Sequence, residues 1–221
     1  MFHWFSIKQK KNLPDYWIRY KDCFSQKLHE NISEVEFVVL DTETTGFDFK
    51  SDRILSIGAV KVAGNVIDIA NSFEVYIHQD KFDPKSVEIH GLLKDGTVKK
   101  LTEHEAIVQF LDYVRNSVIV AHHAYFDINM INEALRRYNL PKLKNKVLDT
   151  GILYRATRIN TNLVDKQKKY TLDDIANAYD ISLKDRHTAS GDAYITAIAF
   201  IKIISKLNKS NTLKTKNLFR L

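Results

Sequence analysis

Three apolar segments in the first half of the chain, at residues 37–40, 54–62 and 66–77, have the length and composition of β-strands. Turn signals separate them, and Gly64-Asn65 between the last two suits a tight hairpin turn. The pattern therefore predicts an antiparallel meander of three strands.

Two shorter apolar runs follow, at residues 118–121 and 147–148, and they alternate with segments in which apolar residues recur at helical spacing. Strands that alternate with helices are typical of parallel pairing. Helices are predicted at residues 103–116, 126–139, 171–179 and 188–207. The chain is therefore expected to form an α/β fold, a mixed five-stranded sheet with helices on both faces.

The ends of the chain differ from this central part, which we delimit as residues 34–207. Residues 1–33 are rich in aromatic and basic side chains, and Trp17, Tyr20 and Phe24 recur at helical spacing. An amphipathic helix is expected there, which either docks on the domain's own surface or anchors a partner. Residues 208–221 form a basic tail that is predicted to fray.

Composition limits the class of protein. With 221 residues, 44% of them hydrophobic and 27% charged, the chain suits one soluble domain with short extensions. The single cysteine, Cys23, excludes an internal disulfide and a cysteine-based zinc site. No apolar run reaches membrane-spanning length, so no membrane contact and a cytoplasmic location are expected. The net charge of +6 suits a polyanionic partner such as nucleic acid.

Acidic residues stand where strands and helices meet. Asp41 and Glu43 end a predicted core strand two positions apart, so their side chains point the same way. Such a pair is either an acidic turn or a site for a hard cation, Mg²⁺ or Mn²⁺. Asp127 begins a helix, where capping competes with a functional role. His187 and Asp192 lie at the start of the last long helix.

Together these residues resemble the three motifs of the DEDDh family of 3′-5′ exonucleases. The motifs are Asp41-Thr42-Glu43, a His-x-Ala-x-Phe-Asp segment that ends at Asp127, and His187 five residues before Asp192. The family includes the epsilon proofreading subunit of bacterial DNA polymerase III, which the chain resembles most, oligoribonuclease and ribonuclease T. Lesser family marks occur at Ile89-His90-Gly91 and at residues 170–176. One departure is His123, where the family usually has asparagine.

The resemblance implies a ribonuclease H-like fold and two Mg²⁺ (or Mn²⁺) ions. Asp41 would bridge the ions, Glu43 and Asp192 would complete one of them, Asp127 would hold the other, and His187 would be the general base. His90 is implied as a ligand of the terminal 3′-hydroxyl. The other residues expected to bind substrate are Thr44, Thr45, Gly46, His122 and His123.

The function implied is hydrolysis of single-stranded DNA from its 3′ end, with release of nucleoside 5′-monophosphates. Proofreading for a DNA polymerase, with the DNA polymerase III catalytic subunit as partner, fits the epsilon likeness. Two alternatives stay open: an RNA-trimming exoribonuclease similar to oligoribonuclease or ribonuclease T, and a non-catalytic module that docks on a polymerase. The C-terminal Lys216-Asn217-Leu218-Phe219 also resembles, weakly, a sliding-clamp peptide.

Overall fold

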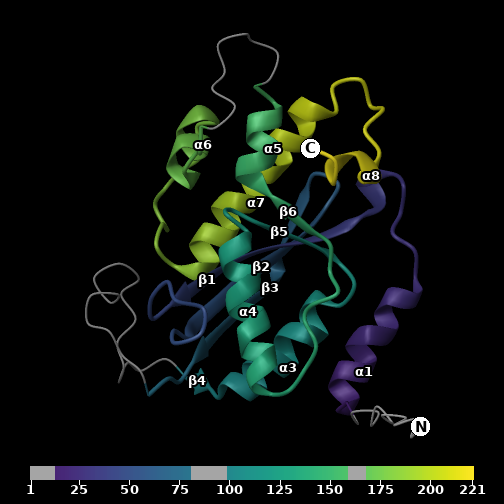
Figure 1. The fold of residues 1–221 in the computed structure, drawn as a ribbon. Helices are drawn as coiled ribbons and strands as arrows, with labels where there is room; N and C mark the ends of the chain where they lie inside the picture. The colour runs from purple at the N-terminus through teal and green to yellow at the C-terminus, as the bar shows by residue number, and fades with distance from the viewer. Residues whose placement is uncertain (1–12, 81–98, 159–167) are drawn as a thin grey trace, which may run out of the picture.

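A mixed sheet forms the centre of the protein (Figure 1). The computed structural model describes residues 13–80, 99–158 and 168–221. Within these residues, six strands are arranged in the order β4-β3-β2-β1-β5-β6. They are β1 (Glu36–Thr44), β2 (Ile54–Ala63), β3 (Val66–Ile77), β4 (Lys100–Leu101), β5 (Val118–Ala121) and β6 (Val147–Asp149).

The pairing of the strands confirms the predicted meander. Strands β1, β2 and β3 pair antiparallel, whereas β5 pairs parallel with β1 and β6 pairs parallel with β5. The prediction of five strands is wrong by one, because β4 pairs parallel with the end of β3. A strand of two residues is too short to produce an alternating pattern in the sequence.

Seven α-helices lie among the described residues. Two of them begin with a capping box, at Thr102 with Glu105 and at Thr171 with Asp174. The short α5 was not predicted. The helices are α1 (Asp15–Asp22), α3 (Glu103–Val114), α4 (Tyr125–Arg137), α5 (Thr150–Ala156), α6 (Leu172–Ala178), α7 (Ala189–Leu207) and α8 (Thr215–Leu218).

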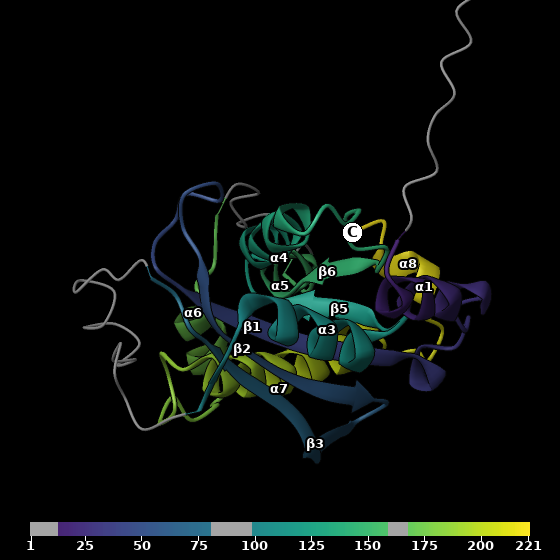
Figure 2. The same cartoon turned by 90° about the horizontal axis from the view of Figure 1, so that it is seen from below.

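Side chains alternate between the two faces of β1 and pack against different helices. Val38 and Leu40 belong to the core beneath α1, α3 and α4, whereas Phe37 and Val39 belong to the core shared with α5, α6 and α7. Figure 2 shows α7 on one side of the sheet and α3 and α4 on the other. By the same alternation, the next odd-numbered residues of β1 face α7.

The N-terminal helix α1 is part of the core. Trp17 and Tyr20 are 2% and 1% exposed, and α1 packs against α3. The Tyr20 hydroxyl donates to Asn145 Oδ1 at 2.6 Å and accepts from the Lys144 backbone N–H at 2.8 Å. Of the two expectations for this helix, docking on the domain's own surface is confirmed. None of the described helices is long and apolar enough to span a membrane.

The C-terminal tail does not fray, contrary to the prediction. The chain turns back after α7, and Lys214 forms an isolated antiparallel β-bridge with Asn31. The Thr215 backbone N–H donates to the Glu30 carbonyl at 3.0 Å. Leu218 is 2% exposed in the α7-side core. The tail is rich in Lys and Asn, and only one or two apolar residues anchor it. The sequence therefore contains no apolar pattern that would predict docking. The clamp-like segment is therefore built into the fold.

Leu218→Ala should lower the free energy of unfolding by about 2–5 kcal/mol, because it removes a fully buried side chain. Urea unfolding monitored by circular dichroism measures this. Leu221→Ala is the matched control, since Leu221 is 52% exposed and its loss should change the free energy by less than about 0.5 kcal/mol. Equal effects of the two substitutions would show that the tail is not docked.

Candidate active site

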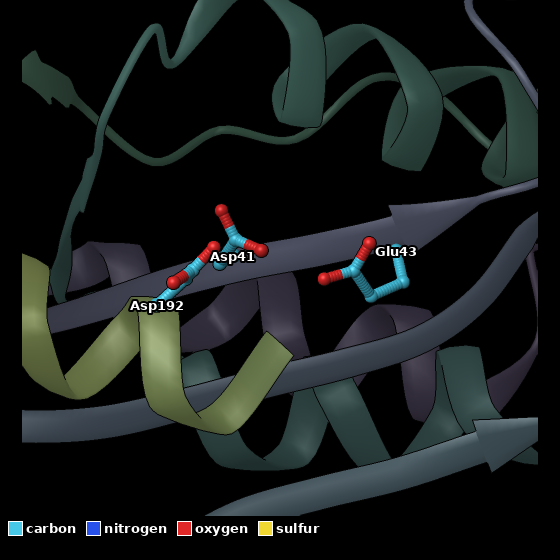
Figure 3. Close-up of side chains that lie close together, drawn as sticks. All are labelled: Asp41, Glu43 and Asp192. Atoms are coloured by element: carbon cyan, nitrogen blue, oxygen red, sulfur yellow. The ribbon is translucent and has the colours of Figure 1, made fainter. Parts of the chain in front are cut away.

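Three carboxyl groups converge at the end of β1. Asp41 and Glu43 of β1 and Asp192 of α7 each place a carboxylate oxygen within 4.8 Å of the other two (Figure 3). Asp41 and Glu43 continue the α7-facing side of the strand, as the two-residue period predicted. Figure 3 shows Asp192 reaching toward Asp41 from the first turns of the helix.

A glycine in β2 brings Asp192 to this position. Gly58 pairs directly with Asp41 in the sheet. A Cβ atom on Gly58 would lie 2.3 Å from the Ala189 carbonyl carbon and from the Ser190 nitrogen. The start of α7 therefore rests on bare strand backbone, which only glycine permits. An isolated glycine inside an apolar strand signals such a close approach, and our reading of the sequence did not use it.

Asp127 approaches the same strand from the opposite side. It lies in the first turn of α4 and is 3% exposed. Its Oδ1 accepts hydrogen bonds from the backbone N–H of Thr42 at 3.0 Å and from the Thr42 hydroxyl at 2.7 Å. Asp127 thus joins α4 to β1, and its charge raises the pKa of Asp41.

The acids crowd one another in the bare protein. Burial, followed by the charges of Asp127, Asp192 and Glu43, raises the pKa of Asp41 well above its usual value. Burial and then Asp192 raise the pKa of Glu43 to about 7, and burial raises the pKa of Asp127 to about 7. Crowded carboxylates of this kind ionise readily only beside a cation.

The chemistry of this donor set fits a hard divalent cation. All donors are carboxylate oxygens, which Mg²⁺ and Mn²⁺ prefer. Asp192 Oδ1 is buried and has no hydrogen-bond partner among the described residues. A buried oxygen without a donor is costly unless a ligand approaches it.

Arg186 is a residue of this site that the sequence did not reveal. Its guanidinium contacts Asp192 through Nη1 and donates from Nε to Asp173 Oδ1 at 2.6 Å. Its positive charge lowers the pKa of Asp41 and of Glu43, against the larger effect of burial. No pattern marks a loop arginine as the partner of an acid six positions later.

His187 follows Arg186 in an exposed loop. Its backbone is left-handed, with φ of 66°, and its side chain faces solvent. The Thr188 hydroxyl accepts from the Gly191 backbone N–H at 3.1 Å and donates to the Asp185 carbonyl at 3.1 Å. The backbone around His187 is therefore fixed to the start of α7, and the imidazole is left accessible.

The loop after β1 closes on a buried aspartate. Thr45 Oγ1 donates to Asp52 Oδ1 at 2.8 Å, and a Cβ on Gly46 would lie 2.6 Å from Asp52 Oδ2. Glycine at position 46 thus leaves room for the Asp52 carboxylate within the loop. The Thr44 hydroxyl donates to the Gly46 carbonyl at 2.8 Å. The hydroxyls of Thr44 and Thr45 therefore both form hydrogen bonds within the loop.

The two adjacent histidines before α4 differ in their surroundings. His122 Nδ1 lies 3.0 Å from the Thr150 hydroxyl, and burial lowers the pKa of His122 to about 4. His123 is exposed and left-handed, with φ of 56°. Asparagine and histidine both adopt this conformation more readily than most residues. The departure at His123 therefore preserves the backbone. His90, the remaining candidate, lies outside the described residues.

Asp149 supports this turn, and the sequence analysis did not single it out. Its Oδ2 accepts from the Ala124 backbone N–H at 2.9 Å, and its Oδ1 accepts from the Gly151 backbone N–H at 2.8 Å. One side chain thereby fixes the entrance of α4 and caps α5. Its signal, an acid followed by Thr-Gly after an apolar pair, is common in turns.

Comparison with known proteins identifies the family. The protein-family model described as Exonuclease matches residues 38–200. This chain belongs to that exonuclease family. The predicted family and fold class are confirmed.

Individual relatives agree with this assignment. DNA polymerase III subunit epsilon of Aquifex aeolicus is 32% identical over 184 residues, which cover 83% of this chain and 87% of that protein. DNA polymerase III PolC-type of Clostridium perfringens is 36% identical over 170 residues, 76% of this chain but only 11% of that polymerase.

A solved structure, the zinc-bound form of the E. coli ExoI–ssDNA complex, has the same fold. Its TM-score is 0.64 at 19% identity, over 81% of this chain and 41% of that chain. At this identity, the likeness supports the architecture alone.

Without metal, the stability of the protein should fall as the pH rises from about 4 toward about 7. The pKa values of Glu43 and Asp127 are higher in the folded chain, at about 7, than in an unfolded chain, so folding favours their protonated forms. Asp41→Asn removes one buried acid that would otherwise have to lose its proton in the folded protein as the pH rises. In EDTA at pH 8 it should raise Tm by about 3 °C or more, and the gain should shrink at pH 4.

Thermal unfolding in EDTA across this pH range, repeated with Mn²⁺, tests the prediction. Mn²⁺ should stabilise the wild type far more than the variant. Asp180→Asn is the control, since Asp180 is exposed and left-handed, a conformation that asparagine tolerates. A wild-type protein as stable as Asp41→Asn at pH 8 would contradict the crowding described above.

Proposed function

We propose that this chain is a metal-dependent 3′-5′ exonuclease that removes nucleoside 5′-monophosphates from single-stranded DNA. The main support is the meeting of Asp41, Glu43 and Asp192, with Asp127 behind them, in a member of the exonuclease family. A purely structural domain has no use for buried acids with raised pKa values. The alternative of a non-catalytic docking module is disfavoured for this reason.

Asp41, Glu43 and Asp192 would hold one Mg²⁺ or Mn²⁺, and Asp127 together with Asp41 would hold a second. Bound ions of this kind supply an acidified water and stabilise charge at the leaving oxygen. Thr42 keeps one oxygen of Asp127 occupied and so fixes the direction of the other. The Asp127 carboxylate would thereby be oriented before any ion binds.

His187 is proposed as the general base. Its imidazole would accept a proton from the attacking water at a ring nitrogen, a role that requires access to solvent and substrate. The exposed ring and the anchored backbone at Thr188 meet both requirements. Gly191 allows this anchoring, since a Cβ there would lie 1.8 Å from the Asp185 carbonyl oxygen.

An aromatic surface beside the acids supports a single-stranded substrate. Phe47 and Tyr125 are 82% and 74% exposed. Between ring centroids, Phe126 lies 5.8 Å from Phe47 and 5.7 Å from Phe49, and Phe49 lies 5.9 Å from Tyr125, so the group is continuous. Stacking on such rings tolerates any base. We propose that bases near the 3′ end stack here, while the backbone of Thr44–Gly46 and the His123 ring approach the terminal sugar and phosphate.

DNA is the proposed substrate, and a replicative polymerase is the proposed partner. One relative is named DNA polymerase III subunit epsilon and another DNA polymerase III PolC-type, and the structural neighbour is a complex with single-stranded DNA. Proofreading for a DNA polymerase III catalytic subunit in the cytoplasm would follow from that likeness. Residues 34–207 are proposed as the catalytic domain. RNA trimming is the second candidate, because no described contact distinguishes a 2′-hydroxyl.

Wild-type protein with Mg²⁺ or Mn²⁺ should shorten a 5′-labelled DNA strand stepwise and release label at once from a 3′-labelled one. EDTA should abolish both reactions, and Asp41→Asn should lose about 100-fold or more in rate. Asp180→Asn is the control. Matched RNA strands report sugar preference, and faster RNA cleavage would replace the DNA assignment. Retained activity in Asp41→Asn would overturn the proposed site.

His187→Ala should lower kcat by about 10²–10⁴-fold, because it removes the proton acceptor. The affinity for Mn²⁺, measured by electron paramagnetic resonance, should stay unchanged, since His187 is not a proposed metal ligand. His29→Ala is the matched control because His29 is also exposed. Wild-type kcat in the His187 variant would exclude its role as the base.

A further inference from the structure

We propose that Glu74 is a positioning residue for this site, holding the start of α7 so that Asp192 meets Asp41 and Glu43. The inference rests on the proposed function, since its purpose is the placement of a metal ligand. Glu74 is in β3, two strands away from Asp41, and does not itself belong to the acidic group.

Asp41, Gly58 and Glu74 form one row across three strands. Gly58 is the register partner of Asp41 in β1 and of Glu74 in β3. Residues directly opposite one another in antiparallel strands project to the same face. Glu74 therefore stands on the α7 side of the sheet, and the backbone of Ala189 and Ser190 fills the gap above Gly58.

A hydrogen bond links the start of α7 to Glu74 of β3. Ser190 Oγ donates to Glu74 Oε1 at 2.5 Å. The Tyr76 hydroxyl donates to the same oxygen at 3.0 Å, and burial followed by this bond raises the pKa of Tyr76 to about 12. Tyr76 thus stays protonated and orients the carboxylate. Among the described residues, Glu74 forms no ion pair, and the Ser190 and Tyr76 hydroxyls donate to its carboxylate.

The hydrogen bond between Ser190 and Glu74 also restrains Asp192, because both Ser190 and Asp192 lie at the start of α7. Asp192 lies two residues after Ser190 in the same first turns, and its buried Oδ1 has no hydrogen-bond partner in the described part of the chain. The start of α7 contacts the sheet at Gly58, where backbone packing sets the distance between the helix and the sheet. This packing does not itself include a hydrogen bond. Glu74 supplies that bond, so it restricts sliding of the turn that carries Asp192.

Binding of Mn²⁺ alone to the full chain, followed by electron paramagnetic resonance, tests this role without any nuclease assay. Glu74→Ala and Ser190→Ala should each weaken Mn²⁺ affinity about fivefold, as expected for loss of one hydrogen bond. The double variant should be no weaker than either single variant, because both remove the same contact. Glu74→Gln keeps an oxygen acceptor and should restore affinity to near the wild-type value.

Asp68→Ala is the matched control, because it removes a negative charge from a half-buried position of the same strand. It should leave Mn²⁺ affinity unchanged. In the nuclease assay, Glu74→Ala should lower kcat at limiting Mn²⁺, and high Mn²⁺ should restore kcat. The KM for the oligonucleotide should stay unchanged.

Two results would overturn the inference. Equal weakening by Glu74→Gln and Glu74→Ala would show that the charge acts through space, and unchanged affinity in Ser190→Ala, a mild surface substitution, would show that the contact has no role. Thermal unfolding of each variant separates these results from loss of the fold. Failure of the wild type to bind Mn²⁺ would instead contradict the proposed function.

Discussion

The elements of this fold hold four acidic side chains together at the end of one buried strand, where they repel each other. Asp41 and Asp127 lose hydration there, and their pKa values rise accordingly. Opposing elements hold the group together: α4 through Thr42, and α7 through its contact with Gly58. The acids are therefore under electrostatic strain in the bare protein, which a bound cation would relieve.

Much of this arrangement was predictable because it follows local rules. The two-residue period of a strand places Asp41 and Glu43 on one side, and helix starts place Asp127 and Asp192 near strand ends. The order of these residues along the chain then identified the family. Apolar runs also located every strand of more than two residues in the described ranges, because each of these strands contains a buried apolar stretch.

The remainder depends on contacts between distant residues, which a pattern does not encode. Asp149 and Asp52 look like ordinary turn acids, yet each organises a loop beside the site. Arg186 meets Asp192 only because a loop folds back on the helix it precedes. The tail was misjudged for a related reason, since Leu218 is one apolar residue among polar ones.

The docked tail has a consequence for how the protein comes to its native state. The Thr215 hydroxyl donates to the Glu30 carbonyl across 185 positions of sequence, and α7 must cross the sheet before that bond forms. Contacts between such distant positions form late and slow folding. A ribosome-bound chain would therefore carry β1 with its acids exposed and unassembled until α7 had emerged, so Asp192 would join Asp41 and Glu43 late in folding.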